Sequence, residues 1–165
     1  MKYYLGLGSN LGDSRSYLRK ALELIESRGI GKILSRSSLY LTEPVAVSGQ
    51  EWFLNAAVAI ESSLAPKKML AELKKIEADL GREKSAKSRQ LPRPIDLDIL
   101  IADDIITSDD NLIIPHPRMQ DRRFVLEPLA EIAGRLVHPV LEKSVVELLG
   151  ASKDKAQVRK LEEKL

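Results

Sequence analysis

The hydrophobic positions in the first hundred residues switch repeatedly between a strand period of two and a helix period of about 3.6. Strands are predicted at 3–7, over an extended segment at 33–42, at 53–61 and at 95–102, each bounded by turn-forming residues. Two helices are predicted between them, with apolar positions at Leu18, Ala21, Leu22 and Ile25 and at Met69, Leu70, Leu73, Ile76 and Leu80. Asp13 or Ser14 can cap the first helix, and Pro66 can open the second.

The pattern after residue 110 predicts shorter elements. Residues 112–114 are a further strand candidate, and 124–133 are predicted as a helix with Pro128 near a turn boundary. A last short helix begins at Ser144, because Ser144-Val145-Val146-Glu147 has the form of a capping box. The charged stretch from residue 151 has apolar residues only at helical spacing, and we expect it to be frayed. The order strand, helix, strand, strand, helix, strand is that of a ferredoxin-like α+β sandwich.

Composition narrows the class of protein. A chain of 165 residues fits one domain, and the absence of cysteine excludes disulfides and thiolate metal sites. The net charge is only +2, from 26 basic and 24 acidic side chains, which argues against a nucleic-acid partner. The N-terminal residues lack the apolar run of a signal peptide, and no stretch is long enough to span a bilayer. We therefore expect a cytoplasmic protein without a membrane partner. A monomer is expected as well, since no extended apolar surface stripe is evident.

The sharpest chemical feature is the sequence Arg93-Pro94-Ile95-Asp96-Leu97-Asp98-Ile99-Leu100. Side chains two apart on a strand share a face, so Asp96 and Asp98 should point the same way, about 6.6 Å apart along the backbone. Aspartate is disfavoured in strands, and magnesium bridging the two carboxylates to phosphate oxygens would compensate for the pair. The alternative is a solvated strand face whose acids prevent aggregation.

A basic segment directly precedes this acidic pair. Five cations lie within twelve residues: Arg82, Lys84, Lys87, Arg89 and Arg93. The segment has no hydrophobic periodicity, so we predict a mobile loop. Such a loop suits a polyphosphate with bound magnesium, because the cations meet phosphate oxygens while the acids hold the metal. A charged loop kept in water is the alternative. Together the two features favour phosphoryl-type transfer.

The strand predicted at 53–61 has two different faces. One face is apolar and predicted to be core: Leu54, Ala56, Val58 and Ile60. Phe53 and Asn55 lie on the other, followed by two alanines that leave room for a flat polar heterocycle. Phe53 could stack on such a ring, and Asn55 offers both a donor and an acceptor. The alternative is that Phe53 is simply a core residue.

Further candidates come from polar residues near turns. His116, between two prolines, could hydrogen-bond a nucleotide, although a turn residue explains it equally well. Arg122 could pair with a phosphate. His138 has no supporting neighbours, and we expect it to be structural. The sequence Gly6-Leu7-Gly8-Ser9-Asn10-Leu11 fails the dinucleotide fingerprint, and no stretch matches the phosphate-binding loop. Any nucleotide would therefore be bound by a site that uses neither of these two motifs.

Four motifs, in this order, resemble the 6-hydroxymethyl-7,8-dihydropterin pyrophosphokinase family: Gly8-Ser9-Asn10-Leu11-Gly12, Phe53-Leu54-Asn55-Ala56, Pro92-Arg93-Pro94-Ile95-Asp96-Leu97-Asp98 and Pro115-His116-Pro117-Arg118-Met119. The resemblance implies a ferredoxin-like three-layer α/β/α sandwich with a mainly antiparallel sheet, formed by residues 1–150, and a charged tail at 151–165. It also implies a step of folate biosynthesis, in which the pterin hydroxymethyl oxygen attacks the β-phosphorus of ATP and releases AMP.

The resemblance further implies a role for each matching residue. The catalytic residues would be Arg82, Arg93, Asp96 and Asp98, of which the two aspartates would coordinate two magnesium ions. The pterin would be contacted by Thr42, Pro44, Val45, Phe53, Asn55 and Phe124. ATP would be contacted by Glu77, Lys84, Arg89, Arg93, Ile99, His116 and Arg122. The basic loop departs from the family pattern, since Lys84 replaces an arginine and no tryptophan lies at 88–90. Lysine cannot make the bidentate phosphate contact of arginine.

Two interpretations from other classes compete with an enzyme. A ferredoxin-like RNA-binding module would show exposed aromatic side chains and a basic surface, but only 4% of this chain is aromatic. A regulatory domain that binds a ligand without chemistry would keep Phe53 and Asn55. It would not need the Asp96 and Asp98 pair with its basic loop.

Overall fold

The computed structural model describes residues 1–43, 51–82 and 92–165, and all structural statements concern these residues. The main sheet runs β5-β1-β4-β3-β8, with β2 also paired to β4, and every pairing in it is antiparallel. Its strands are β1 (Lys2–Ser9), β2 (Lys32–Arg36), β3 (Ser38–Thr42), β4 (Phe53–Glu61), β5 (Asp96–Ala102) and β8 (Val158–Lys164). A separate hairpin joins β6 (Thr107–Asp109) to β7 (Leu112–Ile114).

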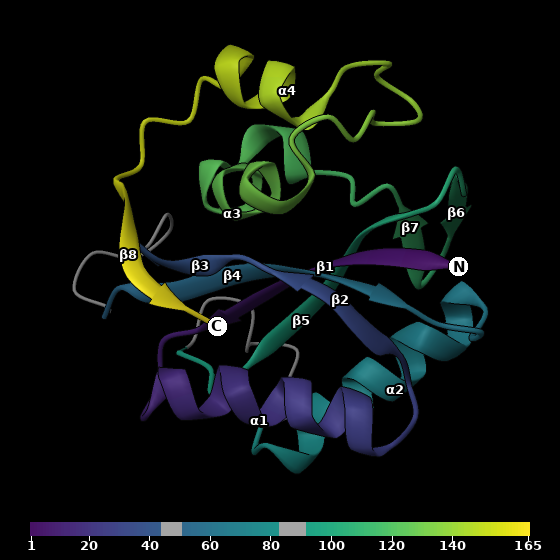
Figure 1. Cartoon of the computed structure of the whole chain (residues 1–165), viewed down its shortest axis with the longest axis vertical. Coiled ribbons are helices and arrows are strands. Elements are labelled where there is room, and N and C mark those ends of the chain that lie inside the picture. The colour runs from purple at the N-terminus through teal and green to yellow at the C-terminus, as the bar shows by residue number, and fades with distance from the viewer. Residues whose placement is uncertain (44–50, 83–91) are drawn as a thin grey trace.

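Helices cover both faces of the main sheet, as Figure 1 shows. The first pair, α1 (Ser14–Ser27) and α2 (Pro66–Asp79), lies on one face. The second pair, α3 (Arg123–Ala133) and α4 (Val145–Ala151), lies on the other, and a short 3-10 helix (Met119–Asp121) precedes α3. None of the described helices is long and apolar enough to cross a membrane. The predicted α+β, ferredoxin-like three-layer sandwich with an antiparallel sheet is confirmed.

The two faces of β4 explain how the layers pack. The predicted core face (Leu54, Ala56, Val58 and Ile60) is buried against α1 and α2. On the opposite face Ala57 and Ala59 pack with α3 and α4 residues in a second core. Because these alanines are small, α3 can approach the middle of the sheet closely, while the larger residues fill the space on the other side.

Local signals define most helix ends. Asp13 caps α1 by accepting a hydrogen bond from the Ser16 amide at 3.1 Å. The predicted capping box at the start of α4 is present, with Ser144 and Glu147 bonded reciprocally. Pro66 occupies the first turn of α2, as predicted. One expectation is wrong, because Pro128 lies inside α3 and is buried rather than near a turn boundary.

The extended segment predicted at 33–42 is interrupted at Ser37. Its backbone N–H donates to the Ala57 carbonyl at 2.9 Å, and its hydroxyl accepts from the Ala57 N–H, also at 2.9 Å. The Ser37 hydroxyl oxygen thus replaces a backbone carbonyl as the acceptor of one hydrogen bond between the two strands. The segment is therefore divided into β2 and β3.

The tail after residue 150 is not frayed, which corrects the expectation from its helical spacing. It forms β8, which pairs with the open edge of β3. Leu165 is buried in the core beside α1, and Glu163 forms ion pairs with Arg15 at 2.9 Å and Arg19 at 2.6 Å. The free N–H and C=O groups along β3 provide a partner that no local periodicity in the tail can indicate.

Candidate active site

Asp96 and Asp98 lie on β5, and their side chains are on the sheet face covered by α3. The residue between them, Leu97, points into the opposite core with α1 and α2. The neighbouring strand β1 places Gly8 opposite Asp96 and Gly6 opposite Asp98. Because glycine has no side chain, β1 places no side chain directly opposite either carboxylate. This arrangement follows from the period of two that the sequence shows.

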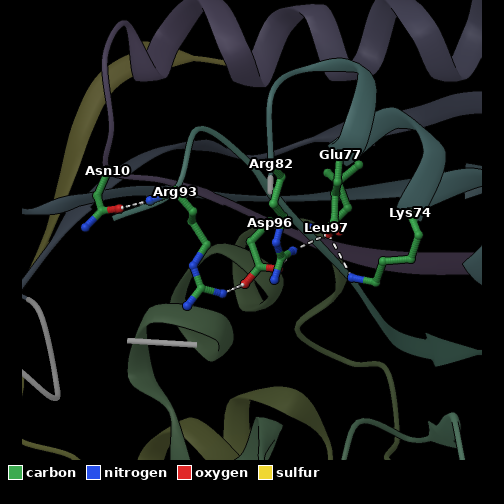
Figure 2. A network of polar contacts seen from close by, with 7 residues as sticks. All are labelled: Asn10, Lys74, Glu77, Arg82, Arg93, Asp96 and Leu97. Carbon is green, nitrogen blue, oxygen red and sulfur yellow. Dashed lines mark hydrogen bonds and ion pairs between the residues drawn. The ribbon is translucent and has the colours of Figure 1, made fainter. Parts of the chain in front are cut away.

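Asp96 is the centre of a charged network (Figure 2). Its Oδ2 pairs with the Arg93 guanidinium at 2.8 Å, and its Oδ1 pairs with Arg82. Arg82 also pairs with Glu77 of α2, with 2.7 Å between Nη1 and Oε1. The structure therefore brings together four of the predicted site residues, from the end of α2, the segment before β5 and β5 itself.

Glu77 is buried, with 2% of its surface exposed, and one of its carboxylate oxygens is shared by three donors. That oxygen accepts the Leu97 backbone N–H at 2.7 Å, the Lys74 ammonium at 2.8 Å and the Arg82 guanidinium. The Leu97 bond attaches α2 to the start of the acidic strand. Sequence reasoning missed Lys74, although its spacing of three residues from Glu77 on a helix was a usable signal.

A second residue without an assigned role, Asn10, anchors Arg93. The Asn10 side-chain oxygen accepts the Arg93 backbone N–H at 2.9 Å, and the Asn10 N–H donates to the Arg93 carbonyl at 3.1 Å. Asn10 is only 3% exposed, and its amide nitrogen donates to the Glu51 carbonyl at 3.4 Å. The turn after β1 thus holds the backbone of the arginine that pairs with Asp96.

The two carboxylates differ in their protonation equilibria. Burial and the neighbouring Asp96 charge raise the pKa of Asp98 to about 6. Burial acts on Asp96 in the same direction, but the guanidinium groups of Arg82 and Arg93 outweigh it and lower the pKa of Asp96. In the part of the chain that the structure describes, Asp98 forms no hydrogen bond or ion pair. A bound cation would therefore stabilise the charged form of Asp98 most.

Three of the predicted pterin residues, Thr42, Phe53 and Asn55, lie near one end of β4. Thr42 pairs with Phe53 across β3 and β4, and the Asn55 side-chain amide donates to the Thr42 hydroxyl at 2.6 Å. Asn55 is 6% exposed, and Gly8 of β1 lies opposite it. A Cβ on Gly8 would come within 2.7 Å of the Asn55 side-chain oxygen, so glycine at this position allows the close approach.

His116 and Arg122 face the acidic strand from the segments before and after the 3-10 helix. The His116 backbone N–H donates to the Leu100 carbonyl at 2.8 Å, and its Nδ1 accepts the Arg118 N–H at 3.2 Å. Burial and the charges of Arg122 and Arg118 lower the pKa of His116 to about 4, so its ring is neutral at pH 7. Its Nε2 then carries the proton and can donate. The Arg122 guanidinium lies 5.5 Å from the centre of the Phe124 ring.

Not every predicted residue is brought into this group. The Ile99 side chain is buried in the opposite core, with α1 and α2, so only its main chain could serve a ligand. Pro44, Val45, Lys84 and Arg89 lie outside the described residues, as does most of the predicted basic loop. His138 is buried, and its Nδ1 accepts the N–H groups of Val140 and Leu141, in keeping with a structural role.

A comparison with protein families identifies the chain. Residues 4–134 match the family model described as 7,8-dihydro-6-hydroxymethylpterin-pyrophosphokinase (HPPK). The chain belongs to the HPPK family. It is therefore an enzyme, a diphosphotransferase that carries out pyrophosphoryl transfer in folate biosynthesis. The RNA-binding and non-catalytic alternatives are not favoured.

Individual relatives agree with this assignment. The chain is 45% identical over 134 residues to a 2-amino-4-hydroxy-6-hydroxymethyldihydropteridine pyrophosphokinase of Methylorubrum extorquens, covering 81% of this chain and 84% of the relative. A Bacillus subtilis protein of the same name is 44% identical over 133 residues, or 81% and 78% of the two chains. A folic acid synthesis protein of Pneumocystis carinii is 44% identical over 142 residues, which are 86% of this chain but only 19% of the relative.

Solved structures support the fold. An HPPK-DHPS structure in complex with substrates matches with a TM-score of 0.69 at 19% identity, over 91% of this chain and 43% of that one. A Plasmodium falciparum HPPK-DHPS with pteroate matches with a TM-score of 0.73 at 17% identity, over 90% and 44%. The chain thus spans less than half the length of these two proteins, and the match covers nearly all of this fold.

Proposed function

We propose that this HPPK chain transfers the pyrophosphoryl group of ATP to the hydroxymethyl oxygen of 6-hydroxymethyl-7,8-dihydropterin. The oxygen attacks the β-phosphorus, the bond to the α-phosphate oxygen breaks, and the products are the pterin diphosphate and AMP. The observation that carries the proposal is the Asp96 and Asp98 pair on one face of β5, with Arg82 and Arg93 beside it. Carboxylates and guanidinium groups in one site suit magnesium and a polyphosphate together.

The donor set fits magnesium. Asp96 and Asp98 would hold the metal, since carboxylate oxygens are its preferred protein ligands. In the described residues no group of three or more His, Cys, Asp and Glu side chains is suited to a metal. When bound, magnesium would polarise phosphate oxygens and acidify the attacking hydroxyl group. Two ions, as expected from the sequence motifs, are part of the proposal.

Arg82 and Arg93 have two functions in the proposal. In the ligand-free protein they neutralise Asp96, which would otherwise be a partly buried, uncompensated charge. With a triphosphate present, the phosphate oxygens compete for the same guanidinium groups. The arginines can then stabilise the negative charge that develops during transfer. Positioning and charge stabilisation are the main contributions a protein makes to this reaction class.

The two substrates are assigned to two different sets of residues around the acidic pair. The pterin is placed with Thr42, Phe53, Asn55 and Phe124, where an amide can read its polar edge and aromatic rings can stack on its faces. ATP is placed with His116 and Arg122, which offer a neutral N–H donor and a cation. Pro44 and Val45 on the pterin side, and Glu77, Lys84, Arg89 and the Ile99 main chain on the ATP side, remain predictions. So do the monomeric state and the cytoplasmic location.

The deciding experiment measures AMP formation from ATP and magnesium, with and without 6-hydroxymethyl-7,8-dihydropterin. Pterin-dependent AMP without ADP is expected. ADP formation would instead indicate an ordinary kinase, and no nucleotide turnover would contradict the proposal. Asp98→Asn should abolish AMP formation, whereas Asp104→Asn is the matched control. Asp104 is exposed in the turn after β5 and should retain wild-type turnover.

A further inference from the structure

The start of α3 lacks a capping side chain of its own. Arg122 is the N-cap residue, and its side chain makes no capping hydrogen bond. The first helical N–H, that of Arg123, instead donates to Asp154 Oδ2 at 2.9 Å. Asp154 lies 31 residues further along the chain, beyond α4. A carboxylate at a helix N-terminus satisfies a free N–H and is favoured by the helix dipole, so Asp154 fixes the turn that precedes Phe124.

The same tail segment holds the end of β3. The Glu43 N–H donates to the Gln157 carbonyl at 3.1 Å, and the Gln157 N–H donates to a Glu43 side-chain oxygen at 3.3 Å. One residue further on, Val158 pairs with Thr42 in the sheet. Thr42 is thereby held between β8 on one side and Phe53 of β4 on the other. Its hydroxyl is the group that accepts the Asn55 amide hydrogen.

These two attachments are close together in the tail. Asp154 and Gln157 are three residues apart, so their Cα atoms can be separated by at most about 11 Å. The Asp154 carboxylate also accepts the Ala156 N–H at 2.9 Å, which makes the connection between the attachments more rigid. In Figure 1 this part of the chain descends from α4 and reaches the sheet edge at β8. It links the start of α3 to the Thr42 end of β3.

We propose that residues 152–158, named the strap here, position the pterin site of this enzyme. The strap holds the start of α3 beside Phe124 and the end of β3 at Thr42, and so links two segments that carry proposed pterin contacts. It lies outside residues 4–134, which match the family model. The inference rests on the proposed function only for the identity of the ligand. The residues of the strap are positioning residues and do not touch the reacting atoms.

The strap can be distinguished from an ordinary structural contact by comparison with the far end of the same tail. Glu163 is also an acid, and its bonds to Arg15 and Arg19 attach β8 to α1, away from Phe124. Replacing either acid removes one negative charge and one tail attachment. Only replacement of Asp154 should change the pterin site.

The experiment compares steady-state kinetics of the full chain with those of Asp154→Ala, Asp154→Asn, Glu43→Ala and Glu163→Ala. Asp154→Ala should raise the KM for the pterin about five- to tenfold, with kcat changed by less than about twofold. The lost cap makes the start of α3 more mobile, but it does not displace the groups that act on the phosphates. Asp154→Asn keeps an oxygen that can accept the Arg123 N–H and should restore most of the affinity. Glu43→Ala should raise the pterin KM in the same direction. Glu163→Ala should leave the pterin KM unchanged.

An equal pterin KM in Asp154→Ala and Glu163→Ala would overturn the inference, as would a loss in kcat alone. Hydrogen exchange provides an independent readout, since Asp154→Ala should reduce protection at the amides of Arg123 and Glu43 while Glu163→Ala should not. If the wild-type chain forms no pterin-dependent AMP, the proposed function fails, and the assignment of the strap to a pterin fails with it. If wild-type AMP formation is normal and the variants do not differ, only the strap is refuted.

Discussion

Asn10 and Arg93 are 83 residues apart in sequence, and each donates a backbone N–H to the other. The Arg93 N–H reaches the Asn10 side-chain oxygen at 2.9 Å, and the Asn10 N–H reaches the Arg93 carbonyl at 3.1 Å. Two bonds in opposite directions leave the Arg93 backbone little freedom to shift. The guanidinium that pairs with Asp96 is therefore aimed by the turn that follows β1.

Asn10→Ala should lower both stability and turnover. The Arg93 N–H loses its acceptor in a partly buried position, which costs about 1–3 kcal/mol of the free energy of unfolding. Arg93 is then less well placed, so kcat should fall more than the affinity for the pterin. Urea denaturation and the AMP assay test both effects. Asn111→Ala, at an exposed turn, is the control and should change neither quantity. Wild-type turnover in Asn10→Ala would show that Arg93 needs no such anchor.

The raised pKa of Asp98 predicts that stability and activity change in opposite directions with pH. The folded protein holds a proton on Asp98 up to about pH 6, whereas the unfolded chain releases it near 3.8. Between these values the folded state binds more protons, so the stability contribution present below pH 4 is lost as pH rises through 6. AMP formation should rise over the same interval, because the charged carboxylate is needed to hold magnesium.

The variant Asp98→Asn tests this prediction. Without metal or nucleotide at pH 7, it should be more stable than the wild-type protein, by at most on the order of 2–3 kcal/mol. At pH 4 the two proteins should be equally stable, since Asp98 is protonated in the wild type. Urea denaturation at the two pH values measures the difference. A variant less stable than wild type at pH 7 would mean that the Asp98 charge is compensated in the folded protein.

The parts of this molecule that sequence reasoning predicted are those specified by local patterns. The alternation along β4 separated the two cores, and the spacing of Asp96 and Asp98 placed both on one face. Two features that it missed, the strand in the tail and the anchor of Arg93, depend on contacts distant in sequence. The spacing in the tail fits a helix, but the open edge of β3 makes the segment a strand. Likewise, the hydrogen bonds between Asn10 and Arg93 exist only once β1 and β5 are paired.

Two replacements of Glu77 should separate the contribution of its charge to stability from that of its hydrogen bond to the Leu97 N–H. Glu77→Gln keeps an oxygen for the Leu97 N–H but loses the charge opposite Lys74 and Arg82, which are partly exposed and so partly solvated. The expected loss is about 1–3 kcal/mol. Glu77→Ala also leaves the Leu97 N–H unsatisfied and should be less stable still. Urea denaturation measures both.

The matched control for this pair is Glu72→Gln on the same helix. Glu72 bonds Lys68 and Lys75 on the surface and should contribute little, because exposed ion pairs are screened by water. If Glu77→Gln proved as stable as Glu72→Gln, the buried network would have no net stabilising effect. Equal stability of Glu77→Gln and Glu77→Ala would show that the bond to Leu97 is unimportant.

Gly8→Ala should weaken pterin binding selectively. The added Cβ would lie 2.7 Å from the Asn55 side-chain oxygen, so the amide must move away from Thr42, the partner it holds at 2.6 Å. A displaced amide no longer reads the polar edge of the pterin, and we expect an affinity loss of about tenfold or more. Gly6→Ala is the control on the same strand, since its Cβ meets only the Leu100 side chain at 3.4 Å. Calorimetric titration with the pterin and a non-hydrolysable ATP analogue measures both affinities. If Gly8→Ala weakened the two ligands equally, Asn55 would not be specific to the pterin side.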